Sequence, residues 1–340
     1  MECVKPQYLG KQSISFRSGV YIESWASVVS KKEGEGPLGT LFDEIEMDEM
    51  FGQKTWEDAE CEMQKRAARL AIQKAGLQED KIRMMFSGDL LAQSTASSLG
   101  SGGLGLPMYG LFGACSTMGE ALSLGAMMIA GGYAEHVLSM TSSHFATAEK
   151  EFRFPLGYGN QRPLSASWTV IGSGACVVGA KESHIRISGV TTGIVTDYGL
   201  KDSMNMGACM APSAYSTIKQ NLEDFGRRPE DYDKIFTGDL GYVGQTILLD
   251  LLEEEGYRIH KQHEDCGILI YDQKTQDTHA GGSGCGCAAS VLTSYILPKV
   301  ESGEWKRILF VPTGALLSKV SFAEGNSVPG IAQAVVIEYV

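Results

Sequence analysis

Short apolar runs alternate along the chain with longer stretches in which apolar residues recur at helical spacing. A helical pattern begins at Trp56, places Met63 and Ala67 on one face, and is predicted to stop at Gly76. The acidic stretch over residues 31–55 is expected to be a solvated helix or loop that follows a short strand at 20–22. Strands that alternate with helices predict parallel-dominated sheets with right-handed crossovers.

A repeated pattern divides the chain into two halves. The sequence Ser-Gly-Asp-Leu at 87–90 closes an apolar strand, and Thr-Gly-Asp-Leu at 237–240 closes a similar one. Each half then has a cysteine-bearing turn, at Cys115 and Cys287, that leads into an apolar helix and a further strand. We therefore predict an internal duplication, with an N-terminal half at 1–182 and a C-terminal half at 183–340.

The helices after Cys115 and Cys287 are apolar nearly all round. A helix without a polar face is buried on every side. The arrangement that buries two such helices places them between two sheets, with other helices outside. The predicted fold class is therefore α/β, with five layers in the order αβαβα.

Composition and charge narrow the classes of function. The 340 residues are 43% hydrophobic and 21% charged, which is typical of a soluble globular protein. A net charge of −12 argues against nucleic-acid binding and against unaided adhesion to an anionic membrane. The longest apolar stretch, at 121–134, is too short to span a bilayer, and no signal peptide is visible. Eight cysteines at irregular spacing favour reduced thiols in an intracellular protein.

Cys115 is the strongest candidate for chemistry. Thr117 and Glu120 have the spacing of a capping box, which places Cys115 just before the first turn of the buried helix. Unpaired N–H groups and the helix dipole stabilise an anion at that position. We therefore expect an acidified thiol and a pocket that accepts an anionic ligand. A buried structural cysteine is the alternative.

The Gly-Ala-Cys-Ser turn at 113–116, the duplication and the Gly-rich segment at 284–290 resemble the thiolase superfamily, and within it the ketoacyl-synthase III branch. The resemblance covers about residues 60–340 and implies a thiolase-like fold with Cys115 at the place of the acyl-accepting nucleophile. The family's histidine and asparagine are replaced here by Gly238 and Cys285. Since losing one oxyanion donor costs about 2.7–4 kcal/mol, the comparison favours a vestigial nucleophile and ligand binding without catalysis.

Two other interpretations stay open. An acyl-transferring enzyme of the ketoacyl-synthase III type would use Cys115 with His144 or His279 as an unusual base. A structural scaffold would fill the pocket with its own side chains.

Three further stretches, at 141–149, 159–163 and 204–207, resemble the thiolase-like stage V sporulation protein AD family. That resemblance implies binding of dipicolinic acid (pyridine-2,6-dicarboxylate), alone or with Ca²⁺, and a role in its uptake into the developing spore and in germination. It also implies partners among membrane proteins of the same operon, a peripheral position at the inner spore membrane, and a homodimer. No cofactor is expected.

A flat dianion is bound best by a helix N-terminus, by arginine guanidinium groups (called forks here) and by apolar or aromatic side chains that line the pocket (called walls here). Arg153 and Arg162 are the candidate forks, and Phe145 and Tyr158 are the candidate walls. Each arginine could instead form a surface salt bridge, and His144 could be a hydrogen-bonded residue of a buried turn. A metal is not expected, because one Cys-x-Cys pair lacks a second pair of ligands. The expected ligand contacts are Cys115, His144, Phe145, Arg162, Asn205, Asp239, His279 and Cys285.

Overall fold

The computed structural model describes residues 7–152 and 161–340. Its main sheet contains two sets of five neighbouring strands. The first half contributes, in spatial order, β3 (Tyr21–Ser30), β9 (Gly172–Gly179), β7 (His136–Ser143), β5 (Met85–Gly88) and β6 (Met108–Leu111). The second half contributes β10 (Ile185–Thr191), β17 (Ala334–Tyr339), β14 (Arg307–Val311), β11 (Lys234–Thr237) and β12 (His263–Asp265).

The two sets share one pairing pattern. In the first, β9 is antiparallel to β3 and β7, while β5 is parallel to β7 and β6. In the second, β17 is antiparallel to β10 and β14, while β11 is parallel to β14 and β12. The sets meet edge to edge where Tyr21 pairs with Arg186. This repeated topology is what two copies of one folding unit produce.

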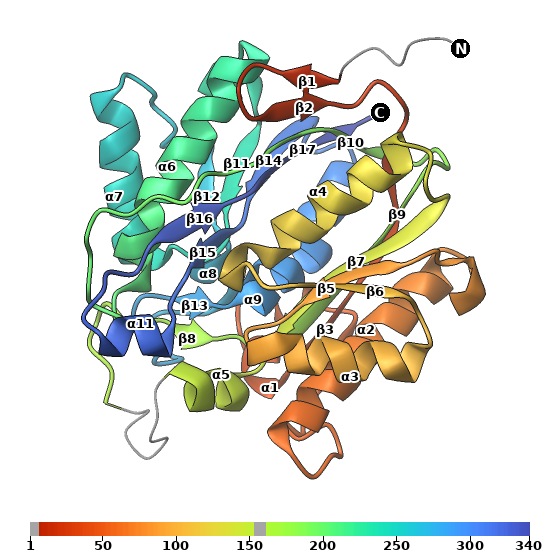
Figure 1. Cartoon of the computed structure of the whole chain (residues 1–340), viewed down its shortest axis with the longest axis horizontal. Coiled ribbons are helices and arrows are strands. Elements are labelled where there is room, and N and C mark those ends of the chain that lie inside the picture. Colours follow the sequence, from red (N-terminus) through yellow and green to blue (C-terminus); the bar gives the residue numbers. More distant parts are fainter. Residues whose placement is uncertain (1–6, 153–160) are drawn as a thin grey trace.

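Helices complete the predicted five layers (Figure 1). Between the two sets of strands lie α4 (Thr117–Ala130) and α9 (Cys285–Val291), and α9 continues through a π-helical turn into α10 (Leu297–Glu301). One outer layer contains α2 (Trp56–Lys74) and α3 (Thr95–Leu104). The other contains α6 (Met206–Phe225) and α7 (Gly241–Glu254). The α/β, five-layer fold class is therefore confirmed.

The central helices are buried because they have no polar face, as their sequences indicate. In α4, Met118, Ala121, Leu122 and Ala126 have no exposed surface, and they pack in one core with residues of both sets of strands. The helix predicted from Trp56 is also confirmed. Thr55 caps α2 by accepting a hydrogen bond from a backbone N–H.

The acidic stretch at 31–55 is more regular than predicted. It contains α1 (Lys31–Gly34) and also β4 (Glu44–Glu46), which pairs in parallel with β3. The remaining short helices are α5 (Phe145–Phe152), α8 (Cys266–Ile270) and α11 (Lys319–Ala323). The remaining short strands are β1 (Tyr8–Leu9), β2 (Ser13–Ser15), β8 (Trp168–Thr169), β13 (Gly282–Ser283), β15 (Thr313–Ala315) and β16 (Gly330–Ala332).

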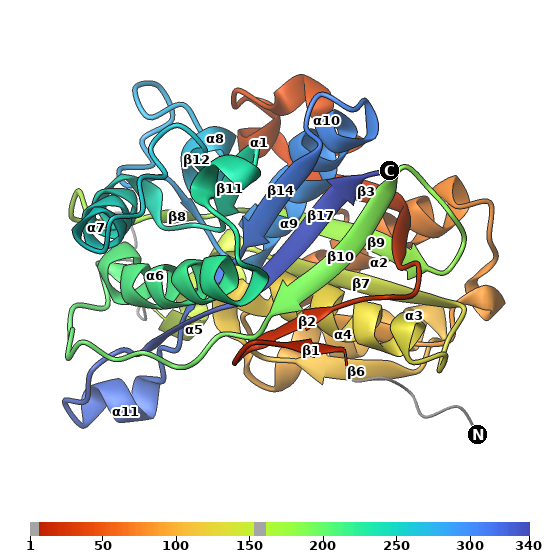
Figure 2. The same cartoon turned by 90° about the horizontal axis from the view of Figure 1, so that it is seen from above.

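Two further elements, the β1–β2 hairpin and α11, lie at the periphery of the molecule. Figure 2 shows the β1–β2 hairpin along β10, to which β2 pairs, and shows α11 projecting at the edge. Within the described residues, no helix has the length and apolar character needed to cross a membrane.

Candidate functional site

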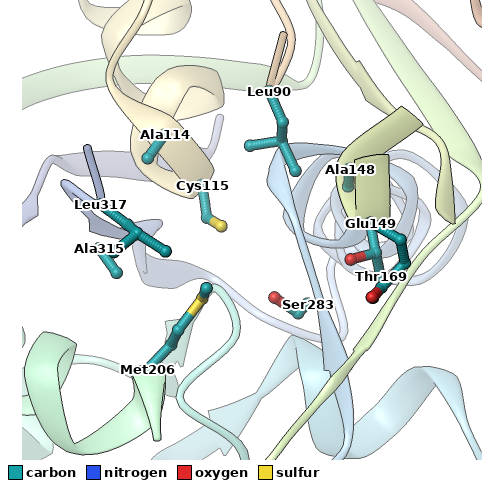
Figure 3. Close-up of a pocket in the computed structure, with 10 residues that line it drawn as sticks. All are labelled: Leu90, Ala114, Cys115, Ala148, Glu149, Thr169, Met206, Ser283, Ala315 and Leu317. Atoms are coloured by element: carbon teal, nitrogen blue, oxygen red, sulfur yellow. The ribbon is translucent and has the colours of Figure 1, made fainter. Parts of the chain in front are cut away.

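Cys115 lies in a tight turn between β6 and α4 and points into a cavity (Figure 3). The turn is a single 3₁₀ turn, Ala114–Ser116, in which Ala114 has a left-handed backbone with φ of 52°. Ser116 Oγ donates to the Gly113 carbonyl at 2.8 Å, and Thr117 Oγ1 donates to the Ala114 carbonyl at 2.6 Å. A left-handed alanine costs about 1–3 kcal/mol, so these bonds help to hold the cysteine in place.

The predicted capping box is wrong. Thr117 is the first residue of α4 and not its cap, because its hydroxyl turns back to the preceding 3₁₀ turn. The Glu120 carboxylate accepts a long hydrogen bond from Ser116 Oγ at 3.4 Å, where a capping box would use a backbone N–H. The extra turn therefore occupies the place where the sequence suggested a cap.

A buried carboxyl group stands against the Cys115 thiol. Asp239 follows the end of β11, and its carboxyl group lies close enough to the Cys115 thiol for each to shift the pKa of the other. Asp239 also accepts hydrogen bonds from the Gly284 N–H at 2.9 Å and from the Thr313 hydroxyl at 3.0 Å. Gly284 has φ of 103°, and a Cβ there would lie 2.6 Å from Ser143 Oγ, so the position requires glycine.

Both groups keep their protons more tightly than usual. Burial raises the pKa of Asp239 to about 7, although its hydrogen bonds favour the ionised form. Burial also raises the pKa of Cys115 well above its usual range, and the charge of Asp239 acts in the same direction. The prediction of an acidified thiol is therefore wrong, because lost hydration and a neighbouring carboxyl group outweigh the helix N-terminus. Near neutral pH, Cys115 is a neutral thiol.

The cysteines of the Gly-rich segment do not line the cavity, although Cys285 packs against Cys115 and Leu90. Cys285, which the resemblance led us to expect at the position of an asparagine, is fully buried and donates its S–H to the Ser142 carbonyl at 2.9 Å. Cys287 Sγ lies 3.7 Å from the Gly238 carbonyl. Burial raises the pKa of both thiols well above the usual range. In the ranges 7–152 and 161–340, His, Cys, Asp and Glu side chains form no group of three suited to a metal.

The cavity at Cys115 has a small inner part and a wider outer part. The inner part has a volume of about 30 Å³, and the outer part, called the vestibule here, has about 200 Å³. Leu90, Ala114, Ala315 and Leu317 line both parts. The inner walls also include Glu149, and neither part is lined by a lysine, arginine or histidine among the described residues. The inner part has room for about two water molecules.

Further carboxyl groups lie in the interior behind Cys285. Burial and the charge of Asp89 raise the pKa of Glu60 to about 8, while the hydroxyls of Ser142 and Thr147 each donate to it at 2.7 Å. Asp89 holds in the first half the position that Asp239 holds in the second, and burial raises its pKa as well. In the described part of the chain, neither Glu60 nor Asp89 pairs with a cation. Among the described residues, carboxyl groups therefore outnumber basic side chains around the cavity.

Two of the expected ligand contacts serve other purposes. His144 Nε2 lies 2.9 Å from the Glu49 carbonyl, and its ring packs against Trp56 at 5.3 Å. Asn205 caps α6 and accepts a hydrogen bond from the Ala208 N–H at 3.3 Å. Neither side chain lines the cavity.

Two others lie on Trp168, and His279 lies beside the Asp277 side chain that pairs with Arg162. Phe145 stacks on the Trp168 ring with a centroid separation of 4.0 Å, and the Arg162 guanidinium lies 4.7 Å from the same ring. His279 Nδ1 lies 2.9 Å from the Pro163 carbonyl. Arg153 and Tyr158, the other predicted fork and wall, lie outside the described residues.

Of the eight expected contacts, Cys115 and Asp239 therefore lie together, three lie at or near Trp168, and His144, Asn205 and Cys285 have other partners. Sequence reasoning missed most of the cavity walls, because they come from separate segments that only the fold brings together. The repeated Gly-Asp-Leu was a signal that Asp239 ends a strand at the level of the site. The missed residues include Leu90, Glu149, Thr169, Met206, Ser283, Ala315 and Leu317.

Comparisons with known proteins identify relatives over nearly the whole chain. The profile of the family described as stage V sporulation protein AD matches residues 10–338. Stage V sporulation protein AD of Bacillus subtilis (strain 168) is 43% identical over 330 residues, which cover 97% of each chain.

Solved structures show the same fold at much lower identity. A crystal structure of OleA from Xanthomonas campestris is 17% identical, with a TM-score of 0.59 over 96% of this chain and 99% of that one. The 3-oxoacyl-[acyl-carrier-protein] synthase III of Aquifex aeolicus is 16% identical, with a TM-score of 0.58 over 94% of this chain and 100% of that one. At this identity the likeness concerns the thiolase-like fold alone.

Proposed function

The chain belongs to the stage V sporulation protein AD family, and on that premise we propose that it binds dipicolinic acid without catalysis and supports its uptake into the developing spore. The observation that supports the absence of catalysis is the raised pKa of the Cys115 thiol, to which burial contributes most and the neighbouring Asp239 also contributes. A nucleophilic cysteine needs a thiolate or an adjacent base. Here a carboxyl group with a raised pKa faces a thiol whose own pKa is raised.

The alternative bases for an acyl-transferring enzyme have other partners. His144 is bonded to the Glu49 carbonyl, and His279 to the Pro163 carbonyl. Burial lowers the pKa of His144, so this imidazole holds a proton less well than usual. These contacts favour binding over acyl transfer from Cys115.

The cavity also indicates which form of dipicolinic acid is bound. Among the described residues, the cavity walls contain no lysine, arginine or histidine that could pair with a free dianion, and the buried Asp239 lies next to them. A desolvated charge without a partner is strongly unfavourable. The calcium chelate of the dianion is neutral overall, and this form matches a cavity that is rich in acids. The inner part is too small for a pyridine ring, so the ring lies in the vestibule with one edge toward Cys115.

Isothermal titration calorimetry with dipicolinate, in the presence and absence of Ca²⁺, tests the proposal. We expect binding of the calcium complex, and affinity at least about tenfold weaker for Leu317→Trp, which fills the vestibule. Leu41→Trp adds the same bulk at an exposed site away from the cavity and should bind like the wild type. No heat with either form of dipicolinate would refute the function. A stable acyl adduct on Cys115 after incubation with acyl-CoA thioesters would favour the enzyme.

We further propose a homodimer and a membrane-protein partner. β6 is the outer strand of its set, and its Tyr109 side chain is 60% exposed, which suits pairing with a second copy. Val195, Tyr198 and Val320 are exposed apolar residues on segments next to the vestibule residues Leu316 to Ser318. They suit docking onto membrane proteins of the same operon at the inner spore membrane.

A further inference from the structure

Arg162 has a buried side chain whose hydrogen bonds are incomplete. Only 2% of the side chain is exposed. Its Nη2 donates to the Asp277 carbonyl at 2.9 Å and to the Asp277 carboxylate at 3.2 Å. Its Nε and Nη1 are also buried, and neither has a hydrogen-bond partner among the described residues. A buried charged donor without a partner raises the free energy of the folded protein, so an acceptor that binds these two nitrogens would be stabilising.

A second cation lies on the same aromatic ring. Lys32 Nζ is 4.3 Å from the centroid of the Trp168 ring, and the Arg162 guanidinium is 4.7 Å from it. Phe145 stacks on this ring, which fixes its position. Burial lowers the pKa of Lys32 and the Arg162 charge does the same, while Glu33 opposes them. Two neighbouring cations held by one indole make a strong position for an anion.

One loop now covers both cations. Lys32 Nζ donates to the Gln276 carbonyl at 2.7 Å, and Arg162 Nη2 donates to the next carbonyl, that of Asp277. Asp277 and His279 both have left-handed backbones, with φ of 51° and 53°. The Asp277 carboxylate is 79% exposed and lies within 3.2 Å of Arg162 and 3.1 Å of His279 Nε2. It is therefore an internal carboxylate ligand on a strained and accessible loop.

We propose that Lys32, Arg162 and Trp168 form a second site that binds a small carboxylate anion in exchange for the Asp277 side chain. A planar carboxylate matches the flat guanidinium, as Asp277 itself shows. Access is from a surface groove of about 480 Å³ lined by Asp277 and His279. None of the three site residues lines the Cys115 cavity or its vestibule, so this inference goes beyond the proposed function and does not depend on it.

The test uses fluorine NMR titrations of 4-fluorobenzoate into the full chain in calcium-free buffer, with inorganic phosphate as a second probe. Asp277→Asn keeps the shape of the side chain but removes the internal competitor. Because the Asp277 carboxylate is 79% exposed, solvent screening limits its competition to about a fivefold effect, so the variant should bind 4-fluorobenzoate about two- to fivefold more tightly. Arg162→Met keeps the apolar stem and should bind at least about tenfold more weakly. Arg69→Met removes an exposed, paired arginine on α2 and should match the wild type.

Each result of these titrations either supports the second site or overturns it. Equal affinity of Arg162→Met and the wild type would overturn the assignment. An absence of 4-fluorobenzoate binding to Asp277→Asn would do the same, and this variant changes only an exposed side chain. Binding of phosphate but not of 4-fluorobenzoate would overturn the carboxylate class. Displacement of 4-fluorobenzoate by excess calcium dipicolinate would show a single shared site and overturn the claim of a second one. Persistence of the bound probe under that excess is the expected result.

Discussion

Replacing Asp239 with asparagine should change the pH dependence of stability in a direction that the site geometry fixes. The folded protein raises the pKa of this carboxyl group from 3.8 to about 7. As the pH rises above 4, the unfolded chain releases the proton while the folded chain keeps it, so Asp239 lowers the free energy of unfolding until the pH passes about 7. The whole change corresponds to about 4 kcal/mol. Asparagine does not titrate in this range, so any effect of the substitution itself on the free energy of unfolding is independent of pH.

About half of that change, or about 2 kcal/mol, falls between pH 5.5 and 8.5. With an unfolding entropy of about 2.1 cal/mol/K per residue, 340 residues give about 0.7 kcal/mol/K. The Tm of Asp239→Asn should therefore rise relative to the wild-type Tm by about 3 °C across this range. Scanning calorimetry or fluorimetry in matched buffers measures the difference, and Asp250→Asn on the exposed side of α7 is the control.

A constant Tm difference between the two proteins from pH 5.5 to 8.5 would refute the reasoning. It would mean that Asp239 is already ionised in the folded protein at low pH. In that case the Cys115 thiol would face a fixed negative charge at every pH tested, and the raised pKa assigned here to Asp239 would be wrong.

The thiol, the central helix and the outer strand β6 each give a further prediction. At pH 8, iodoacetamide should alkylate Cys115 at least about tenfold more slowly than it alkylates a free thiol, and Asp239→Asn should make the reaction faster. Peptide mass mapping measures both rates. Fast labelling of the wild type would contradict the raised thiol pKa. Leu122→Ala in buried α4 should lower the free energy of unfolding by about 2–5 kcal/mol, whereas Leu124→Ala, which is 36% exposed, should cost much less by chemical denaturation. Tyr109→Asp should convert dimers to monomers in sedimentation experiments, and an unchanged dimer would place the interface elsewhere.

The fold was predictable because its signals are local and repeated. The further strand expected after Cys287 and its apolar helix is β14. The helix from Trp56 ends just before Gly76, which has the left-handed backbone expected of a residue after a helix. The duplicated Gly-Asp-Leu sequences lie at the ends of two equivalent strands. The nearly all-round apolar character of α4 was enough to predict its place between the two sets of strands, since it has no polar face for solvent.

The chemistry of the site was less predictable because it depends on long-range contacts. The helix N-terminus suggested an acidified thiol, but Asp239, from the other half of the chain, reverses that effect. His144 and Phe145 are neighbours in sequence, yet the first faces Trp56 and the second stacks on Trp168. β4 was missed because its pairing with β3, and not its own acidic sequence, makes it a strand.

A crystal structure with calcium dipicolinate would show whether the vestibule is a ligand site beside an inert thiol. We expect one pyridine ring in the vestibule between Leu90 and Leu317, with the anomalous signal of calcium beside it and an unmodified thiol at Cys115. An empty vestibule with the chelate bound elsewhere would contradict the proposed binding site, and an acylated Cys115 in crystals grown with an acyl-CoA would contradict the absence of catalysis.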